Sequence, residues 1–197
     1  MLPYRIKRTL IWFKRMRHVQ GFGIQSPSAF SFDRNVINDH TKYCIYSELK
    51  LNTPKSSKLI DKKARLLYRI NRFLKADNFY FYPKKIELYA NYIVAAYNTK
   101  IVEAKLYNYN IENVEKEKTN VYFLSILADY LNYYKSIRHK VGTNSIIIID
   151  GINRNNEAKQ FWKAVIEDEN VSFSYDLYYL GIVFFDKRPK QNYIINF

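Results

Sequence analysis

The stretch Ser145–Phe185, SIIIIDGINRNNEAKQFWKAVIEDENVSFSYDLYYLGIVFF, decides the fold class of this chain. It opens with four consecutive isoleucines, a β-branched run that is too short for a helix and typical of a strand buried on both faces. Residues 155–167 then carry apolar side chains three to four positions apart, which predicts an amphipathic helix. Residues 171–175 and 180–185 read as two further strands, with 192–197 as a partner for the second. This order of elements is typical of the end of an α/β domain.

Upstream of this stretch, the apolar periodicity predicts the same alternation of helices and strands. Ser57 can cap the first of these helices. The predicted elements are a helix over 58–74, a strand over 78–82, a helix starting at Pro83, strands over 99–104 and 121–126, and a helix over 128–141. Only 16 residues, 105–120, separate the strands at 99–104 and 121–126. A helix, a strand and another helix need about 25–35 residues, so we expect one element to be missing there.

The charge of the chain is concentrated in its first third. Residues 1–75 hold 17 Lys or Arg against 4 Asp or Glu, a net charge of +13, whereas residues 76–197 hold 15 against 14. We therefore divide the chain into a basic helical extension over 1–57 and an α/β domain over 58–197. The charge favours an anionic partner for residues 1–75, either nucleic acid or an anionic membrane surface. Its alternative is a solvated face on helices that pack against the domain.

The first predicted helix, residues 4–19, carries the residues that would contact such a polyanion. Its apolar side chains fall on one face, and Trp12 could stack on a base or lie at a membrane interface. The candidate polyanion-binding residues are Arg5, Arg8, Trp12, Lys14, Arg15 and Arg17. The same helix could instead lie across the sheet of the domain.

Two segments of the chain resemble a known family. DGINRNNEAKQFW, from Asp150, and SFSYDLYYLGIVFF, from Ser172, resemble the C-terminal end of class I SAM-dependent methyltransferases. They are closest to a bacterial subgroup whose last strands read TIDLFxxGIVFF, and GFGIQSPSAF, from Gly21, is similar to its HGxHSPFVF segment. The resemblance implies a Rossmann-like, mostly parallel sheet closed by an antiparallel C-terminal strand pair, with SAM as the cofactor.

The cofactor loop of that family does not match. Its pattern, ExGxxxG, follows the first strand, because glycines let the backbone pass close under the cofactor and adopt positive φ angles. None of the five glycines of this chain lies between residues 79 and 96, and Tyr82, Pro83, Lys84 and Lys85 occupy the loop instead. The expected acidic residue is also missing. The sequence therefore predicts that SAM does not bind, and that no cofactor replaces it.

Two acidic residues at strand ends could line what remains of the pocket. Glu103 ends the second predicted strand, where the family places an acid that binds the ribose of the cofactor, and Asp150 ends the isoleucine strand. We take both as candidate cofactor-binding residues. The catalytic residues are unknown, because no nucleophile–base pair or carboxylate pair stands out. Cys44 is the only cysteine and the three histidines are isolated, so we expect no metal site.

Three functions are consistent with these residues. The first is a methyltransferase-like protein that has lost cofactor binding and acts as a binding or scaffold protein, through a protein partner or self-association. The second is an active SAM-dependent methyltransferase of unknown substrate, which leaves open whether the chain is an enzyme. The third is a nucleic-acid or anionic-membrane binding module that uses residues 1–75. The absence of a signal peptide or apolar span favours the cytoplasm.

Overall fold

A computed structural model describes residues 4–18, 23–51, 56–104, 117–127 and 129–197. The first half of the described chain is helical, and its elements are α1 (Tyr4–Lys14), the short 3₁₀ helix η1 (Met16–His18), α2 (Pro27–Phe32), the π-helix η2 (Asp33–Ile37), α3 (Ile45–Leu51) and α4 (Lys58–Leu74). Strands and helices then alternate: β1 (Asn78–Tyr82), α5 (Glu87–Ala96), β2 (Lys100–Glu103), β3 (Asn120–Ser125), α6 (Tyr130–Ile137), β4 (Ile146–Asp150), α7 (Asn156–Glu167), β5 (Phe173–Asp176), β6 (Leu180–Phe184) and β7 (Gln191–Ile194).

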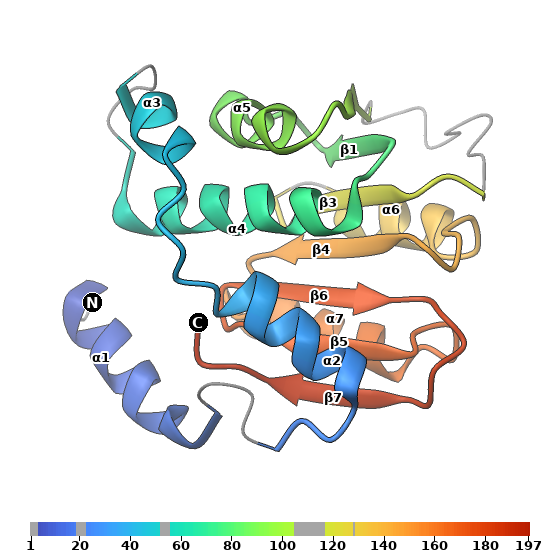
Figure 1. Cartoon of the computed structure of the whole chain (residues 1–197). Helices are drawn as coiled ribbons and strands as arrows, with labels where there is room; N and C mark the ends of the chain where they lie inside the picture. The colour runs from blue at the N-terminus through green and yellow to red at the C-terminus, as the bar shows by residue number, and fades with distance from the viewer. Residues whose placement is uncertain (1–3, 19–22, 52–55, 105–116, 128) are drawn as a thin grey trace.

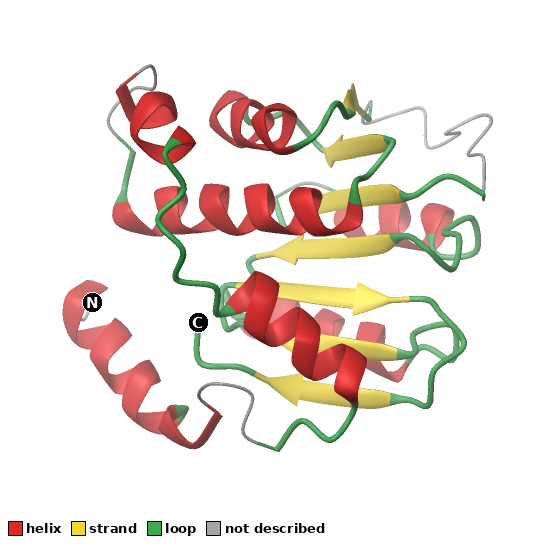
Figure 2. Ribbon diagram, in the orientation of Figure 1, coloured by secondary structure: helices red, strands yellow, loops and turns green. Residues whose placement is uncertain are grey.

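The strands of the described chain form one seven-stranded sheet in the order β2-β1-β3-β4-β6-β5-β7 (Figures 1 and 2). β1 pairs in parallel with β2 and β3, β3 with β4, and β5 with β7. β6 is antiparallel to both of its neighbours, β4 and β5. The predicted α/β class, a mostly parallel sheet with an antiparallel C-terminal strand pair, is therefore confirmed.

Most of the predicted helix and strand boundaries lie within a few residues of the observed ones. The predicted cap of α4 is present, because Ser57 Oγ accepts a hydrogen bond from the Ile60 N–H at 3.3 Å. Asn155 caps α7 in the same way, through its Oδ1 atom and the Ala158 N–H at 2.8 Å. The helix expected to start at Pro83 begins instead at Glu87, since Ile86 is still extended. Residues 105–116, where we expected a missing element, lie outside the described residues.

The pairing of the last strand differs from the prediction. We expected residues 192–197 to pair with the strand at 180–185, but β7 pairs with β5, with Phe173 opposite Gln191. β6 has no free edge for β7, because it pairs with β5 on one side and with β4 on the other, where Phe184 lies opposite Ile146. β7 therefore adds a parallel strand at the edge of the sheet.

Two hydrophobic cores lie on opposite faces of the sheet, and strand alternation assigns the side chains to them. One core packs the sheet against α2, η2, α3, α4 and α5, and the other packs it against α6 and α7. Phe81 and Ile148 point to the α4 side, whereas Tyr82 and Ile149 point to the α6 and α7 side. At the strand ends, the same alternation turns neighbouring residues to different faces.

The segment from α2 to α3 belongs to the first of these cores. Phe32, Val36 and Tyr46 are buried there with residues of α4 and of the sheet. The Arg69 guanidinium of α4 donates hydrogen bonds to the carbonyl oxygens of Val36 at 2.6 Å and Ile37 at 3.2 Å. The helices between residues 27 and 51 thus share a core with α4 and the sheet, whereas α1 lies apart from the body of the described structure (Figure 1).

A glycine in β6 marks the closest approach between the sheet and α7. A Cβ atom at Gly181 would lie 2.4 Å from the Cζ3 atom of the Trp162 ring, which is buried in the core on that side. Real carbon atoms do not approach so closely, so only glycine allows the indole to lie flat against the strand.

Candidate functional site

The carboxyl ends of β1, β3 and β4 meet at one edge of the sheet, where open α/β sheets bind their ligands. The two acidic candidates lie at this edge, Glu103 at the end of β2 and Asp150 at the end of β4. They do not lie on neighbouring strands, because β1 and β3 stand between β2 and β4. Each of the two is bound to a group of the protein itself.

Asp150 forms an ion pair with Lys63 of α4, whose ammonium lies against the Asp150 Oδ1 atom. The Lys63 side chain is only 10% exposed and the Asp150 side chain 19%. Tyr89 lies near enough for its pKa to be raised, mainly by burial and further by the negative charge of Asp150. The carboxylate that we predicted first for ligand binding is therefore held in an internal, largely buried ion pair.

Glu103 stabilises the loop that follows β1. Its Oε2 atom accepts a hydrogen bond from the backbone N–H of Lys85 at 2.9 Å. The Lys85 ammonium turns away to Glu87, with Nζ and Oε1 2.8 Å apart. Glu103 thus fixes the loop, with one of its two carboxylate oxygens engaged by the backbone.

Tyr82 fills the space at the end of β1 with an aromatic ring. The side chain is fully buried, and its ring stacks on Tyr133 of α6 with centroids 4.0 Å apart and an interplanar angle of 9°. The Tyr82 hydroxyl donates a hydrogen bond to the Asp129 carbonyl at 3.2 Å. Burial also raises the pKa of the Tyr133 hydroxyl, which therefore remains neutral. The space after β1 is therefore occupied by packed protein side chains.

A small cavity of about 270 Å³ remains beside the ends of β3 and β4. Lys63, Asp150 and Gly151 lie on its wall, together with Arg154 and Tyr179. Arg154 is committed to the protein, because its guanidinium donates a hydrogen bond to the Ile126 carbonyl at 3.1 Å. Gly151 has a φ of 98°, which suits glycine at the turn after the strand. The charged groups on the wall of this cavity, Lys63, Asp150 and Arg154, are thus bound to other groups of the protein.

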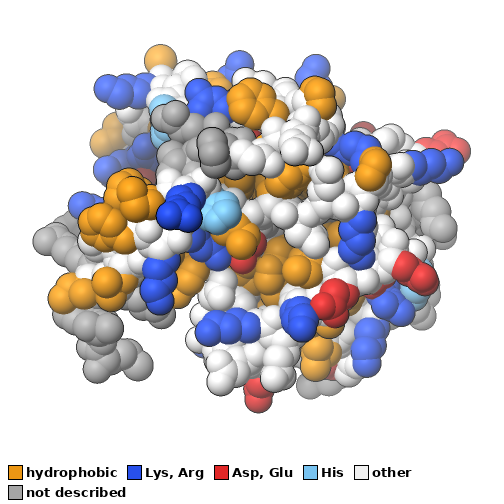
Figure 3. Space-filling model, turned by 90° about the horizontal axis from the view of Figure 1, so that it is seen from below, with side chains coloured by type: hydrophobic (Ala, Val, Ile, Leu, Met, Phe, Trp, Pro, Cys, Tyr) orange, Lys and Arg blue, Asp and Glu red, His pale blue; other side chains and the backbone are white. Residues whose placement is uncertain are grey.

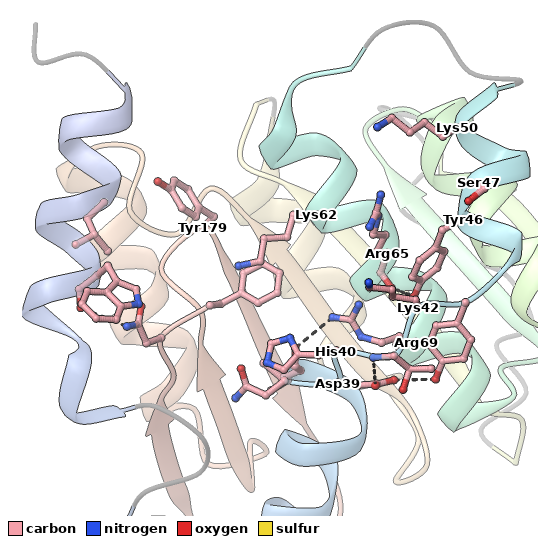
Figure 4. A pocket seen from close by; sticks show the side chains of 18 residues that line it. Asp39, His40, Lys42, Tyr46, Ser47, Lys50, Lys62, Arg65, Arg69 and Tyr179 are labelled. Carbon is pink, nitrogen blue, oxygen red and sulfur yellow. Dashed lines mark hydrogen bonds between the residues drawn. The ribbon is translucent and has the colours of Figure 1, made fainter.

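A second cavity, of about 780 Å³, lies between α1, α3, α4 and the C-terminal residues (Figure 4). Most of its charged side chains are cations, which come from separate elements: Lys42, Lys50, Lys62, Arg65 and Arg69. Its one carboxylate, Asp39, accepts hydrogen bonds from the Thr41 N–H at 2.8 Å and the Tyr43 hydroxyl at 2.7 Å. Burial would raise the pKa of the Asp39 carboxyl, but these bonds outweigh it and lower the pKa. We call this space the basic cavity.

Sequence reasoning missed the basic cavity, although part of its signal is present. Lys62, Arg65 and Arg69 recur at intervals of three and four residues, which places them on one side of α4. Two of these cations make cation–π contacts with aromatic rings. The Lys62 ammonium lies 4.0 Å from the centre of the Phe197 ring, and the Arg65 guanidinium lies 5.0 Å from the centre of the Tyr46 ring. Their convergence with Lys42 depends on the path of the chain before α3, for which the sequence has no local signal.

The predicted polyanion-binding residues divide into separate groups. Arg15 is bound to the body, because its guanidinium donates to the backbone carbonyl and the carboxylate of Asp176, both at 2.9 Å. Trp12 is half exposed and lies on the wall of the basic cavity, while Lys14 and Arg17 are exposed. The side chains of Arg5 and Arg8 are outside the described part of the structure.

Among the described residues, no three His, Cys, Asp or Glu side chains are grouped closely enough to hold a metal ion. No helix in the same residues is both long and apolar enough to span a membrane.

The comparisons with known proteins concern the fold. No protein-family model and no curated protein matches the sequence. The chain is similar in structure to a methyltransferase from Geobacter sulfurreducens, with 7% identity, 73% of this chain and 97% of that chain covered, and a TM-score of 0.47. It is also similar to the SAH-bound methyltransferase PaMTH1 of Podospora anserina, with 13% identity, coverage of 95% and 99%, and a TM-score of 0.48.

The chain forms an open α/β sheet, with parallel strands β1 to β4 and an antiparallel β6 inserted between β4 and β5. At such low identities, the two similar structures say nothing about the residues of a site. The chemistry of this chain must therefore be argued from its own side chains.

Proposed function

We propose that this chain is a methyltransferase-fold protein that does not bind SAM at its strand ends and acts as a binding protein. The observation that carries the proposal is the state of the strand ends. Tyr82 fills the position after β1, Lys63 neutralises Asp150, and Glu103 accepts the Lys85 N–H. A cofactor would have to displace a packed ring and compete with a buried ion pair. Both changes oppose binding.

The basic cavity favours an anionic ligand for this binding protein. Its volume falls within the range of small-molecule sites, and cations predominate among the charged side chains on its wall. Arg65 is paired with Asp61 at 3.0 Å and Arg69 binds backbone carbonyls, so the lysines are the cations that we expect to contact a ligand. Aromatic side chains, among them Trp12 and Tyr43, line the same cavity. Cations beside aromatic rings suit a ligand that joins a phosphate to a planar base. A nucleotide is the ligand class that this chemistry fits best.

Calorimetric titration tests the proposal with two probes, SAM and ADP. We expect no heat of binding with SAM and saturable binding with ADP. The double variant Lys42→Gln/Lys62→Gln should weaken ADP binding by about tenfold or more, because charge-assisted hydrogen bonds are lost. Lys159→Gln, at an exposed position of α7, is the matched control and should change nothing.

Each result of the titration has a distinct meaning. SAM binding in the micromolar range would contradict the proposal and support an active methyltransferase. In that case Glu103→Ala should weaken SAM binding by about 1–3 kcal/mol, as for a lost charged hydrogen bond. If ADP fails to bind, or binds equally well to the double variant, the basic cavity is not its site.

A further inference from the structure

The helix α1 turns its apolar side away from the body of the protein. The large apolar side chains on that side are 48–57% exposed, and they are Ile6, Leu10 and Phe13, followed by Met16 just after the helix. Trp12 is 49% exposed as well, but it lies beside the stripe, on the wall of the basic cavity. Ile6, Leu10 and Phe13 recur at i, i+4 and i+7, so they form one continuous stripe along the helix. Such stripes normally face a core, and an exposed apolar patch of this kind marks an interaction site.

The position of α1 on the body accounts for this orientation. Arg15, which binds Asp176, projects from the side of the helix opposite to the stripe, since it is nine residues after Ile6 and two after Phe13. The C-terminal residues hold the same end of the segment, through the Asn196 N–H to the His18 carbonyl at 2.9 Å and the Asn196 amide to the Trp12 carbonyl at 3.3 Å. The stripe is thus held outward by contacts on the opposite side.

Positive charge surrounds the stripe. Residues 1–32 contain six Lys or Arg and no Asp or Glu. Lys14 and Arg17 are exposed beside the apolar side chains, and neither belongs to an ion pair among the described residues. Figure 3 shows hydrophobic side chains gathered at the left of the molecule with Lys and Arg side chains next to them. The surface therefore combines an apolar stripe with an unneutralised positive charge.

We propose that α1 docks this protein on an anionic lipid bilayer. Helices that lie in the plane of a membrane surface combine apolar and aromatic side chains, which enter the acyl boundary, with Lys and Arg, which bind anionic headgroups. Nucleic acid would match the charge but would leave Ile6 and Leu10 in water. A second copy of the chain would cover the stripe but would bring like charges together. The bilayer satisfies both features of the surface.

The proposed docking on a bilayer can be tested separately from the binding of SAM or ADP. Leu10 and Phe13 are not among the residues that line the basic cavity, and Phe13 touches it only through Trp12, with ring centroids 5.3 Å apart. Ile11 and Trp12 do line it, which places the proposed membrane surface next to the proposed ligand site.

Vesicle co-sedimentation of the full chain tests the docking. We expect binding to phosphatidylcholine vesicles that contain about a third phosphatidylserine, and little binding to pure phosphatidylcholine. Leu10→Ser/Phe13→Ser should lower the partition coefficient at least about tenfold. Lys14→Gln/Arg17→Gln should lower it about 25-fold, at about fivefold per cation. Val94→Ala/Leu131→Ala, at two equally exposed apolar positions on other helices, should leave it unchanged.

Tryptophan fluorescence separates docking on the bilayer from general adhesion by charge. Trp12 is 49% exposed and Trp162 only 7%, so a blue shift on vesicle binding reports on Trp12. We expect this shift in the original chain and its loss in Leu10→Ser/Phe13→Ser. Absence of vesicle binding, or binding without a shift, would overturn the proposal. Salt-dependent binding to single-stranded RNA, without binding to vesicles, would also overturn it. A dimer in light scattering that is lost in the Leu10→Ser/Phe13→Ser variant would overturn it as well.

Discussion

Replacing Tyr82 by alanine should lower the free energy of unfolding by about 3–5 kcal/mol, the usual cost of deleting a large buried aromatic side chain. The ring is fully buried and stacks on Tyr133, so its loss removes both apolar contacts and an aromatic pair. The substitution also removes the hydrogen bond from the Tyr82 hydroxyl to the Asp129 carbonyl, which keeps the one that it accepts from the Tyr133 N–H. Urea denaturation, followed by circular dichroism, measures the change.

Tyr97→Ala is the matched control for this variant. Tyr97 lies just after α5 and is 41% exposed, so its removal should change the free energy of unfolding by less than about 0.5 kcal/mol. If Tyr82→Ala were as mild as the control, the ring would not be packed as described. The space after β1 would then be open to a ligand, and the main reason to expect no SAM binding would be lost.

Breaking the ion pair between Lys63 and Asp150 should have an effect of similar size. Lys63→Met leaves the Asp150 carboxylate without its partner in a largely buried position, for an expected loss of about 3–5 kcal/mol. Asp150→Asn should cost a comparable amount, because the ammonium of Lys63 is then uncompensated. Combining the two substitutions should cost clearly less than the sum of the single effects. Urea denaturation of the four proteins gives this double-mutant cycle.

Lys163→Met provides the control for the ion pair. Lys163 and Glu167 form an exposed pair on α7, with Nζ and Oε1 3.9 Å apart and side chains 75% and 65% exposed. Removing such a surface pair should cost at most about 0.5 kcal/mol. Strictly additive effects of Lys63→Met and Asp150→Asn would mean that the two side chains do not interact, and Asp150 would then be available to a ligand.

Much of the fold could be predicted from local sequence. The isoleucine run, the apolar spacing of α4 and α7, and the caps at Ser57 and Asn155 identify elements because strand burial, helical periodicity and capping act within a few residues. The start of α5 was misplaced because Pro83 favours a first helical turn but does not enforce one. The partner of β7 was also wrong, since strand pairing depends on which edge is free, and that is a property of the whole sheet.

The candidate site was predictable in position but not in its contacts. Glu103 and Asp150 lie at strand ends, as the pattern of strands required. Their partners could not be found in the same way, because Lys63 is 87 residues from Asp150 and looks like any other lysine of a basic helix. The stripe on α1 shows the same limit. Its periodicity was visible in the sequence, but the side that faces the body is set by Arg15 and its partner Asp176.

The most direct test of the account is a titration with SAM followed by amide NMR. Three backbone amides report on the strand ends, those of Lys85, Glu103 and Gly151, because they flank the loop after β1, the end of β2 and the end of β4. With about 1 mM SAM, enough to detect even weak binding, we predict that these three amide signals do not move. Saturable shifts of all three would place SAM at the strand ends and contradict the claim that this protein has no cofactor site there.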